Sequence, residues 1–190
     1  MSVFEKMRST LGAYPDTDVR GLLQADHVRI RELAKDLAEA ASAPQRKALL
    51  RELKPFLTAH SRSEEAAVYA SLMESRKSPD SRLAGNEGMV EHNLADIVLE
   101  RLANTADATS DMWKAHAKVL HESLEHHIKE EESELFEELG EHFSDAERQG
   151  MAAQFLRAKE KYPTAVAPGV KPSRGRSVAE PVDAVGAGTL

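Results

Sequence analysis

Apolar residues recur at alternating intervals of four and three along several stretches of this chain of 190 residues. The clearest stretch has its repeating positions at Val19, Leu23, His27, Ile30, Ala34 and Leu37. Such spacing places side chains on one face of an α-helix, whereas a half-buried strand needs strict alternation, which no stretch shows convincingly. With no internal repeat of longer period, the sequence predicts an all-α fold.

Four long helices are expected, separated by short polar connections. They are predicted from residue 16 or 18 to about 41, from 44 to about 74, from about 89 to 102, and from 111 to about 139. Short connections between long helices are typical of an up-down-up-down four-helix bundle. A capping box at Ser144-Asp145-Ala146-Glu147 predicts a short fifth helix after the bundle.

Glycine and proline suggest where the helices are interrupted. Pro55 is expected to kink the second helix or to mark a boundary, because its ring clashes with the preceding turn. Gly85 and Gly88 lower helix propensity, so the third helix is expected to be clear only from Met89. Gly140 is a natural residue to follow the end of the fourth helix.

The domain organisation follows from these elements. Residues 1–17 are predicted to be a lead-in, residues 18–140 the four-helix bundle and residues 141–162 an accessory helix. Residues 163–190 contain mostly Pro, Gly, Ala and Val and are predicted to be a disordered tail.

Composition excludes several classes of function. The chain contains no cysteine, which removes disulfides, thiolate metal sites and thiol nucleophiles. A formal net charge of -7 argues against nucleic-acid binding, which needs a basic surface. No apolar run is long enough to span a membrane, and the first ten residues lack the apolar core of a secretory signal. We expect a cytoplasmic protein.

Histidine lies on the inward face of every predicted bundle helix, at His27, His60, His92 and His127. Glu64 and Glu131 follow two of these histidines by four residues and therefore share their helical face. Burying imidazoles and carboxylates without partners is costly. Their distribution over four helices predicts a shared metal site.

Each part of this pattern has an ordinary explanation when taken alone. A single inward histidine is more often a hydrogen-bonded structural residue than a ligand. The acidic run at residues 130–134 is typical of a solvated helix face, and only Glu131 lies at a position that faces inward. Core packing alone does not explain why four imidazoles and two carboxylates face inward. That set, without thiolate, favours iron or manganese over structural zinc.

An ordered series of short motifs resembles a known family. The motifs are Asp26-His27, His60-x-x-x-Glu64-Glu65, Glu91-His92 and His127-x-x-x-Glu131-Glu132-x-x-Leu135-Phe136. Over roughly residues 18–140 they resemble the hemerythrin-like, HHE cation-binding domain. The resemblance implies a non-haem site of two iron ions, oxo- or hydroxo-bridged. It further implies that the four histidines are terminal ligands, with Glu64 and Glu131 bridging.

The third helix departs from the pattern of oxygen-carrying hemerythrins, which place two histidines one turn apart there. The residues four before and four after His92 are Gly88 and Asp96. The site therefore lacks one imidazole unless Glu91 or Asp96 takes its place as an additional ligand. An open position would admit peroxide or nitric oxide as well as oxygen.

Several neighbours of these histidines have secondary candidate roles. Asp26, beside His27, and Glu125, near His127, are candidates to orient the imidazoles by hydrogen bonds, as metal-bound histidines normally require. His126 is an alternative ligand in place of His127. Glu65 and Glu132 are rotated by about 100° from the bridging positions, which predicts either a supporting or a solvated role.

The sequence thus predicts a di-iron protein that binds or reacts with O2, peroxide or nitric oxide. If it is an enzyme, a peroxide-decomposing or other di-iron oxidoreductase is expected. The alternative is an iron or oxygen sensor, or a metal-stabilised interaction bundle without catalysis, signalling through the accessory helix or the tail. A metal-free bundle is the remaining alternative. Which protein would bind the tail is left open.

Overall fold

The computed structural model describes residues 14–75 and 78–162, and every regular element in these ranges is helical. The elements are α2 (Val19–Glu39), α3 (Ala43–Glu64), η1 (Glu65–Tyr69), α4 (Ala70–Glu74), α5 (Pro79–Asn104), α6 (Asp111–Glu130), η2 (Glu131–Leu135), α7 (Phe136–His142) and α8 (Asp145–Lys159). No strand occurs within these two ranges, so the prediction of an all-α fold is confirmed for them.

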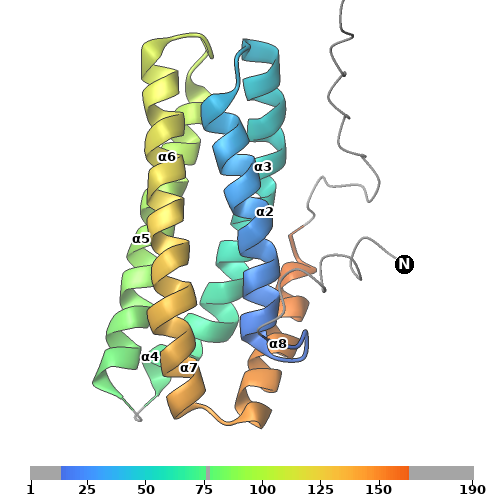
Figure 1. Ribbon diagram of the computed structural model, residues 1–190, viewed down its shortest axis with the longest axis vertical. Coiled ribbons are helices and arrows are strands. Elements are labelled where there is room, and N and C mark those ends of the chain that lie inside the picture. The colour runs from blue at the N-terminus through green and yellow to red at the C-terminus, as the bar shows by residue number, and fades with distance from the viewer. Residues whose placement is uncertain (1–13, 76–77, 163–190) are drawn as a thin grey trace, which may run out of the picture.

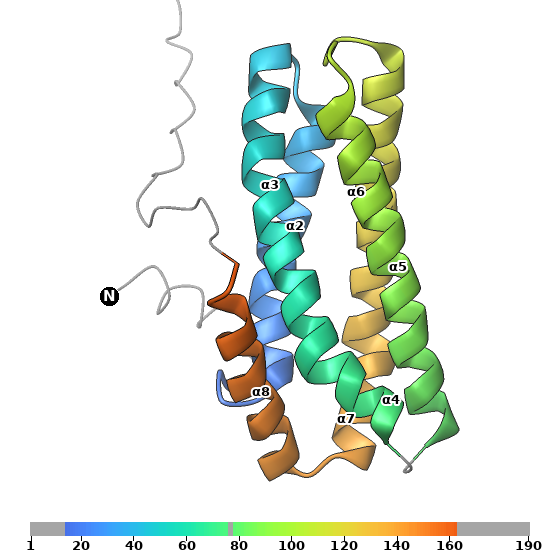
Figure 2. The same ribbon diagram turned by 180° about the vertical axis from the view of Figure 1, so that it is seen from behind.

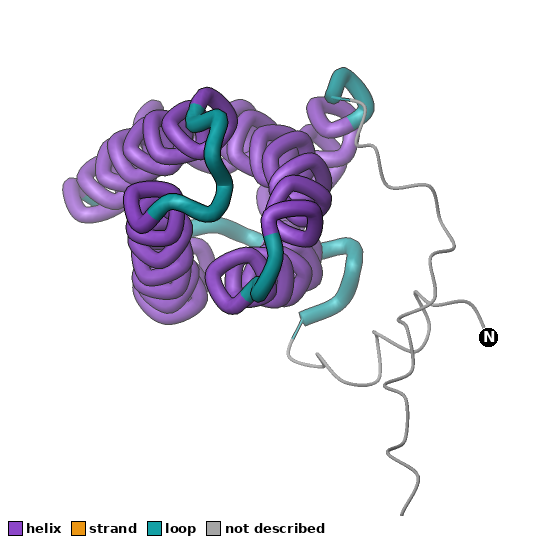
Figure 3. The backbone as a smooth tube through the Cα atoms, turned by 90° about the horizontal axis from the view of Figure 1, so that it is seen from above, coloured by secondary structure: helices purple, strands orange, loops and turns teal. Residues whose placement is uncertain are grey.

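Four helical columns lie along a common axis (Figure 1). Two columns are the single helices α2 and α5, whereas α3 continues through the π-helical turn η1 into α4, and α6 continues through η2 into α7. α2 packs against α3 and α6, and α5 packs against α6 and α3. The columns surround a shared centre when seen along the axis (Figure 3). The loops between them lie at alternating ends (Figures 1 and 2).

Side-chain caps explain where the helices begin. The capping residues are Asp18, Ser42, Ser78, Ser110 and Ser144, and each accepts a hydrogen bond from a backbone N–H in the first turn of its helix. Such a cap satisfies an amide that has no partner inside the helix. The predicted capping box is confirmed, because Glu147 also accepts from the backbone N–H of Ser144 at 2.7 Å.

α8 lies outside the four columns and packs against α2, α3 and η1 (Figure 2). Arg148, which is buried, attaches its first half to the bundle. The guanidinium donates to the carboxylate of Asp18 at 2.9 Å and to the carbonyls of Leu139 and Phe143. The accessory helix is therefore held by a buried polar network as well as by apolar contacts.

Two predicted interruptions of the helices are wrong, and at Pro55, where the sequence predicts a kink or a boundary, the boundary is absent. No boundary falls at Pro55, because packing of the buried Leu53 and Leu57 on either side holds α3 together. α5 begins at Pro79 rather than near Met89, since Ser78 caps its first turn. The fourth column continues through Gly140 to His142.

The apolar core is divided into two clusters along the bundle axis. One cluster includes Ile30, Leu57 and Ile128, and the other includes Leu23 and Leu135. The inward histidines fall between them: His27, for example, lies between Leu23 of one cluster and Ile30 of the other along α2. A polar layer thus crosses the bundle at one level.

Some predictions fall partly or wholly on other parts of the chain. Most of the predicted lead-in and all of the predicted tail lie outside the described residues. The division into a bundle, an accessory helix and flanking segments stays a prediction. Among the described helices, none combines the length and the apolar character that a membrane span requires.

Candidate metal centre

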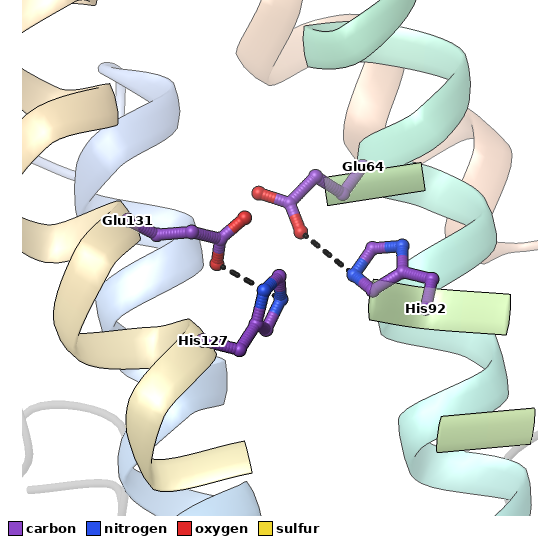
Figure 4. Close-up of side chains that lie close together, drawn as sticks. All are labelled: Glu64, His92, His127 and Glu131. Atoms are coloured by element: carbon purple, nitrogen blue, oxygen red, sulfur yellow. Dashed lines mark ion pairs between the residues drawn. The ribbon is translucent and has the colours of Figure 1, made fainter. Parts of the chain in front are cut away.

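The polar layer consists of six buried side chains from all four columns. They are His27 of α2, His60 and Glu64 of α3, His92 of α5, His127 of α6 and Glu131, the first residue of η2. None exceeds 5% exposure. Figure 4 shows four of them: the carboxylates of Glu64 and Glu131 point toward each other from opposite columns, with His92 and His127 beside them.

Each carboxylate has one oxygen between two imidazoles. Oε2 of Glu131 lies 3.2 Å from Nε2 of His27 and 3.4 Å from Nε2 of His127. Oε2 of Glu64 lies 3.4 Å from Nε2 of His60 and 3.6 Å from Nε2 of His92. The geometry therefore brings together all six residues that the sequence predicts as ligands.

Two overlapping groups of donor atoms have the spacing of a metal site. One group is Glu64, His92, His127 and Glu131, and the other is His27, His60 and Glu131; within each group the donor atoms lie within 4.8 Å of one another. Glu131 belongs to both groups. This arrangement suits two adjacent cations that share a carboxylate.

The donor atoms themselves are buried without hydrogen bonds. These are Nε2 of all four histidines, both oxygens of Glu64 and Oε2 of Glu131. Elsewhere in the described ranges, only Nδ1 of His116 is in this condition. An unsatisfied buried polar atom costs about 1–3 kcal/mol, and here seven such atoms converge on one place. The residues present therefore fit a metal centre.

A carboxylate contacts the outer nitrogen of every imidazole in the centre. The pairs are His27 Nδ1 with Glu132 (3.1 Å), His60 Nδ1 with Asp26 (3.2 Å), His92 Nδ1 with Glu65 (3.2 Å) and His127 Nδ1 with Glu91 (2.6 Å). A carboxylate at Nδ1 favours a proton on that atom, so Nε2 is the nitrogen that remains to bind a metal ion.

Comparison with known proteins agrees with this geometry. Residues 18–139 match the family model described as the hemerythrin HHE cation binding domain. The chain belongs to the hemerythrin HHE cation-binding domain family. No curated protein and no solved structure matches it. Family membership and the cluster of imidazoles and carboxylates together indicate a metal-binding protein, and iron is the metal typical of the hemerythrin family.

In this hemerythrin-like bundle, each orienting carboxylate comes from the column next to its histidine. Asp26 of α2 contacts His60 of α3, and Glu65 of η1 contacts His92 of α5. The same relation continues from α5 to α6 and from η2 back to α2, so the set closes into a ring. Each carboxylate adjoins a candidate ligand in sequence, and the rotation of about 100° per residue aims it at the neighbouring column.

Of the two residues predicted to orient imidazoles of the centre, Asp26 contacts one and Glu125 does not. Asp26 contacts His60 rather than its sequence neighbour His27. Glu125 does not orient His127; it lies 3.6 Å from Arg31 and 3.9 Å from His121, and Glu91 takes the expected place. Glu125 precedes His127 by two residues and therefore projects from a different face of α6, which is why that prediction is wrong.

The other suggested ligands lie outside the centre. Glu91 contacts the outer nitrogen of His127, and Asp96 pairs with Arg62. His126 has a side chain 65% exposed and pairs with Glu130 at 3.2 Å. Glu91, His126 and Glu130 form a separate, partly exposed group of possible donors. Neither Glu91 nor Asp96 therefore fills the missing third-helix position, and His126 does not replace His127.

Three of the four orienting carboxylates are themselves held by cations. Arg31 donates to Glu132 at 3.0 Å, Arg62 to Glu65 at 2.5 Å, and Lys159 to Asp26 at 2.6 Å. Burial alone would raise the pKa of each of these carboxyls, but their histidine and cation partners outweigh it and lower the pKa. These carboxylates therefore stay ionised.

The pKa values of the two inner carboxyl groups are shifted in opposite directions. Burial and the charge of Glu131 raise the pKa of Glu64 well above its usual value. Burial opposes ionisation of Glu131 too, but His127 and His27 hold its pKa well below the usual value. Burial would likewise lower the pKa of His127, yet Glu131 and the hydrogen bond with Glu91 raise it to about 9.

Tyr69 is a residue of this centre that sequence reasoning missed. Its buried hydroxyl donates a hydrogen bond to Oε1 of Glu131. An α-helix rotates a residue five positions after Glu64 by about 140° from its face. The π-helical turn η1 changes that rotation, and the sequence carries no clear signal for such a turn.

Proposed function

We propose that this hemerythrin-family protein is a non-haem di-iron protein with an up-down-up-down bundle that binds or reacts with O2, peroxide or nitric oxide. The observation that carries the proposal is the convergence of unsatisfied, buried Nε2 and carboxylate atoms from four columns. Loops at alternating ends of the columns support the bundle order. Iron would supply a binding position for the small ligand and electrons for its reduction.

The assignment of residues follows the donor groups. His27 and His60 would hold one ion, and His92 and His127 the other. Glu64 and Glu131 would lie between the ions. Imidazole and carboxylate donors without thiolate suit iron and manganese.

The surroundings of the centre restrict what can reach it. All six candidate ligands are buried, and apolar clusters lie on both sides of the polar layer. Such burial excludes bulk water and large substrates, and it suits ligands of two or a few atoms. In the metal-free protein, burial and the charge of Glu131 raise the pKa of Glu64, which favours the protonated form of its carboxyl group.

Metal analysis of the purified full chain tests the proposal directly. We expect two irons per chain and near-ultraviolet absorption bands of a bridged ferric pair. His127→Ala should lose most of the iron, whereas the exposed neighbour His126→Ala should retain it. Iron retained in full by His127→Ala would contradict the assignment.

Loss of added peroxide then distinguishes reaction from binding. We expect the iron-loaded protein to consume peroxide at a rate that falls with His127→Ala and not with His126→Ala. Reversible binding of O2 or nitric oxide without peroxide loss would favour a binding role for the same centre.

A sensor is the second candidate, because the accessory helix contacts the centre through one chain of polar groups. Lys159 of α8 lies 2.6 Å from Oδ1 of Asp26, and Oδ2 of Asp26 lies 3.2 Å from Nδ1 of His60. A change at His60 could thus reach α8. Hydrogen exchange in α8 should change on iron loading in the wild type and not in Lys159→Met, with the exposed Lys161→Met as control. Identical hydrogen exchange in α8 with and without iron would contradict the sensor function.

Three further expectations belong to this proposal. The net charge of -7 supports small ligands rather than nucleic acid as partners. A cytoplasmic location remains a prediction, and which protein would bind residues 163–190 is left open.

A further inference from the structure

Tyr69 occupies the space beside the centre that a second side chain from α5 would otherwise reach. Gly88 lies one helical turn before His92. A Cβ atom added to Gly88 would stand 2.3 Å from Cζ and 2.4 Å from Oη of Tyr69. Real Cβ contacts are not that short, so glycine at residue 88 admits the ring. The Tyr69 ring also lies against the imidazole of His92, with ring centroids 5.3 Å apart.

The π-helical turn η1 brings Tyr69 to this place. The backbone N–H of Ala70 donates to the carbonyl of Glu65, which is the five-residue hydrogen bond of a π-helix. This wider turn carries Tyr69 back toward the helix face that bears Glu64. π-Helical turns inside α-helices occur frequently at functional sites.

The hydroxyl of Tyr69 makes the two inner carboxylates unequal. It donates to Oε1 of Glu131, whose Oε2 makes no hydrogen bond and faces His27 and His127. Both oxygens of Glu64 are without hydrogen bonds.

We propose that Tyr69 is a positioning residue of the metal centre. Its ring takes the place of the absent third-helix donor, and its hydroxyl keeps Oε1 of Glu131 from binding a metal ion. Glu131 then offers one oxygen to the metal ions and Glu64 offers two. Gly88 contributes to the same arrangement, because its lack of a side chain leaves room for the Tyr69 ring. This inference rests on the proposed metal-binding function.

Cobalt(II) titration of the metal-free full chain tests the role of Tyr69. Tyr69→Phe keeps the ring and removes only the hydroxyl, so the fold should persist by circular dichroism. Without the hydroxyl, the carboxylate of Glu131 is no longer held in place, so the affinity for Co(II) should fall by about tenfold or more. This is the usual effect of removing a group that orients a metal ligand. The visible absorption of bound Co(II) should also change, because Oε1 becomes available to the ion.

Gly88→Ala should reproduce these effects, since the added Cβ displaces the ring, and combining it with Tyr69→Phe should add little. Tyr162→Phe and Gly150→Ala are matched controls, because Tyr162 is exposed and nothing lies within 4 Å of a Cβ at Gly150. In a Tyr69→Ala background, Gly88→His should restore affinity by placing an imidazole one turn before His92.

The outcomes separate this inference from the proposed function. Wild-type protein that binds no Co(II) would overturn the metal centre and the role of Tyr69 together. Wild-type binding with an unchanged affinity and spectrum in Tyr69→Phe would overturn the role of Tyr69 alone. A higher affinity in Tyr69→Phe would also contradict it.

Discussion

Each imidazole of the centre directs Nε2 inward and is held at Nδ1 by a carboxylate. The carboxylate comes from a neighbouring column in every case, for example Glu65 of η1 for His92 of α5. Removing an orienting partner of a metal-bound histidine typically costs 10- to 100-fold in affinity, roughly. We therefore expect the acidic residues beside the candidate ligands to contribute to metal binding without touching the ions.

Glu91 and Glu125 form a matched pair for testing this point. Glu91 lies 2.6 Å from Nδ1 of His127, whereas Glu125 is closest to Arg31 among the contacts it makes. Glu91→Ala should lower Co(II) affinity by about tenfold or more, and Glu125→Ala should leave it within about twofold of the wild type. Equal effects of the two substitutions in a titration would contradict the assignment of Glu91.

Metal affinity should also depend on pH through His127. Burial opposes its charge, but Glu131 and Glu91 raise its pKa from 6.5 to about 9, so the metal-free protein carries a proton on this imidazole at neutral pH. A metal ion must displace that proton. Affinity should therefore rise with pH from 6.5 toward about 9 and then level off. Calorimetry in buffers of different ionisation enthalpy measures the released proton, and a pH-independent affinity over this range would contradict the prediction.

The accessory helix is the element whose attachment depends most on one side chain. Arg148 is 7% exposed and bonds to Asp18 of the α2 cap and to two carbonyls at the end of α7. Asp18 is 130 residues from Arg148 in the sequence, whereas Leu139 and Phe143 precede it by 9 and 5 residues. They meet only because α8 turns back along the bundle, so α8 stabilises the ends of two other elements.

Arg148→Met should lower the free energy of unfolding by about 3 kcal/mol, because it removes a buried guanidinium that donates to one carboxylate and two carbonyls. Arg157→Met on the exposed face of α8 is the control and should change it by less than about 0.5 kcal/mol. Urea denaturation measures both. If Arg148→Met lowers the free energy of unfolding by less than about 1 kcal/mol, contacts other than those of Arg148 hold α8 to the bundle.

Across the whole molecule, one polar layer connects all four columns between two apolar clusters. A metal ion bound there stabilises the folded chain and not the unfolded one, since the site barely exists without the fold. At a free metal concentration of 100 times Kd, the gain is about 2.7 kcal/mol. Metal binding and global stability are therefore linked.

Glu64 provides the test of this link. Both of its oxygens are buried without hydrogen bonds, and its pKa is raised by burial and by Glu131. Glu64→Leu should therefore increase the Tm of the metal-free protein while removing the increase that Co(II) produces in the wild type. Addition of a chelator should lower the Tm of metal-loaded wild type and leave Glu64→Leu unchanged. A destabilised, metal-binding Glu64→Leu variant would contradict the prediction.

Helical geometry explains what sequence reasoning could establish. The spacing of Leu23, His27 and Ile30 places an imidazole on an apolar face, because 3.6 residues per turn is a local property of the backbone. The same geometry identified six residues that the fold brings together. It failed at Tyr69, where a π-helical turn replaces the expected rotation, and at Glu125, which α-helical spacing left as a candidate beside His127.

The sequence by itself thus determined the helical class, the family motifs and the six inward donors, all of which depend on residues within a turn or two of each other. The tertiary structure alone decided which carboxylate meets which imidazole, as with His27 and Glu132, which are 105 residues apart. It also decided that Tyr69 fills the space over Gly88. These contacts depend on how the columns approach one another, and no local rule of helix geometry contains that information.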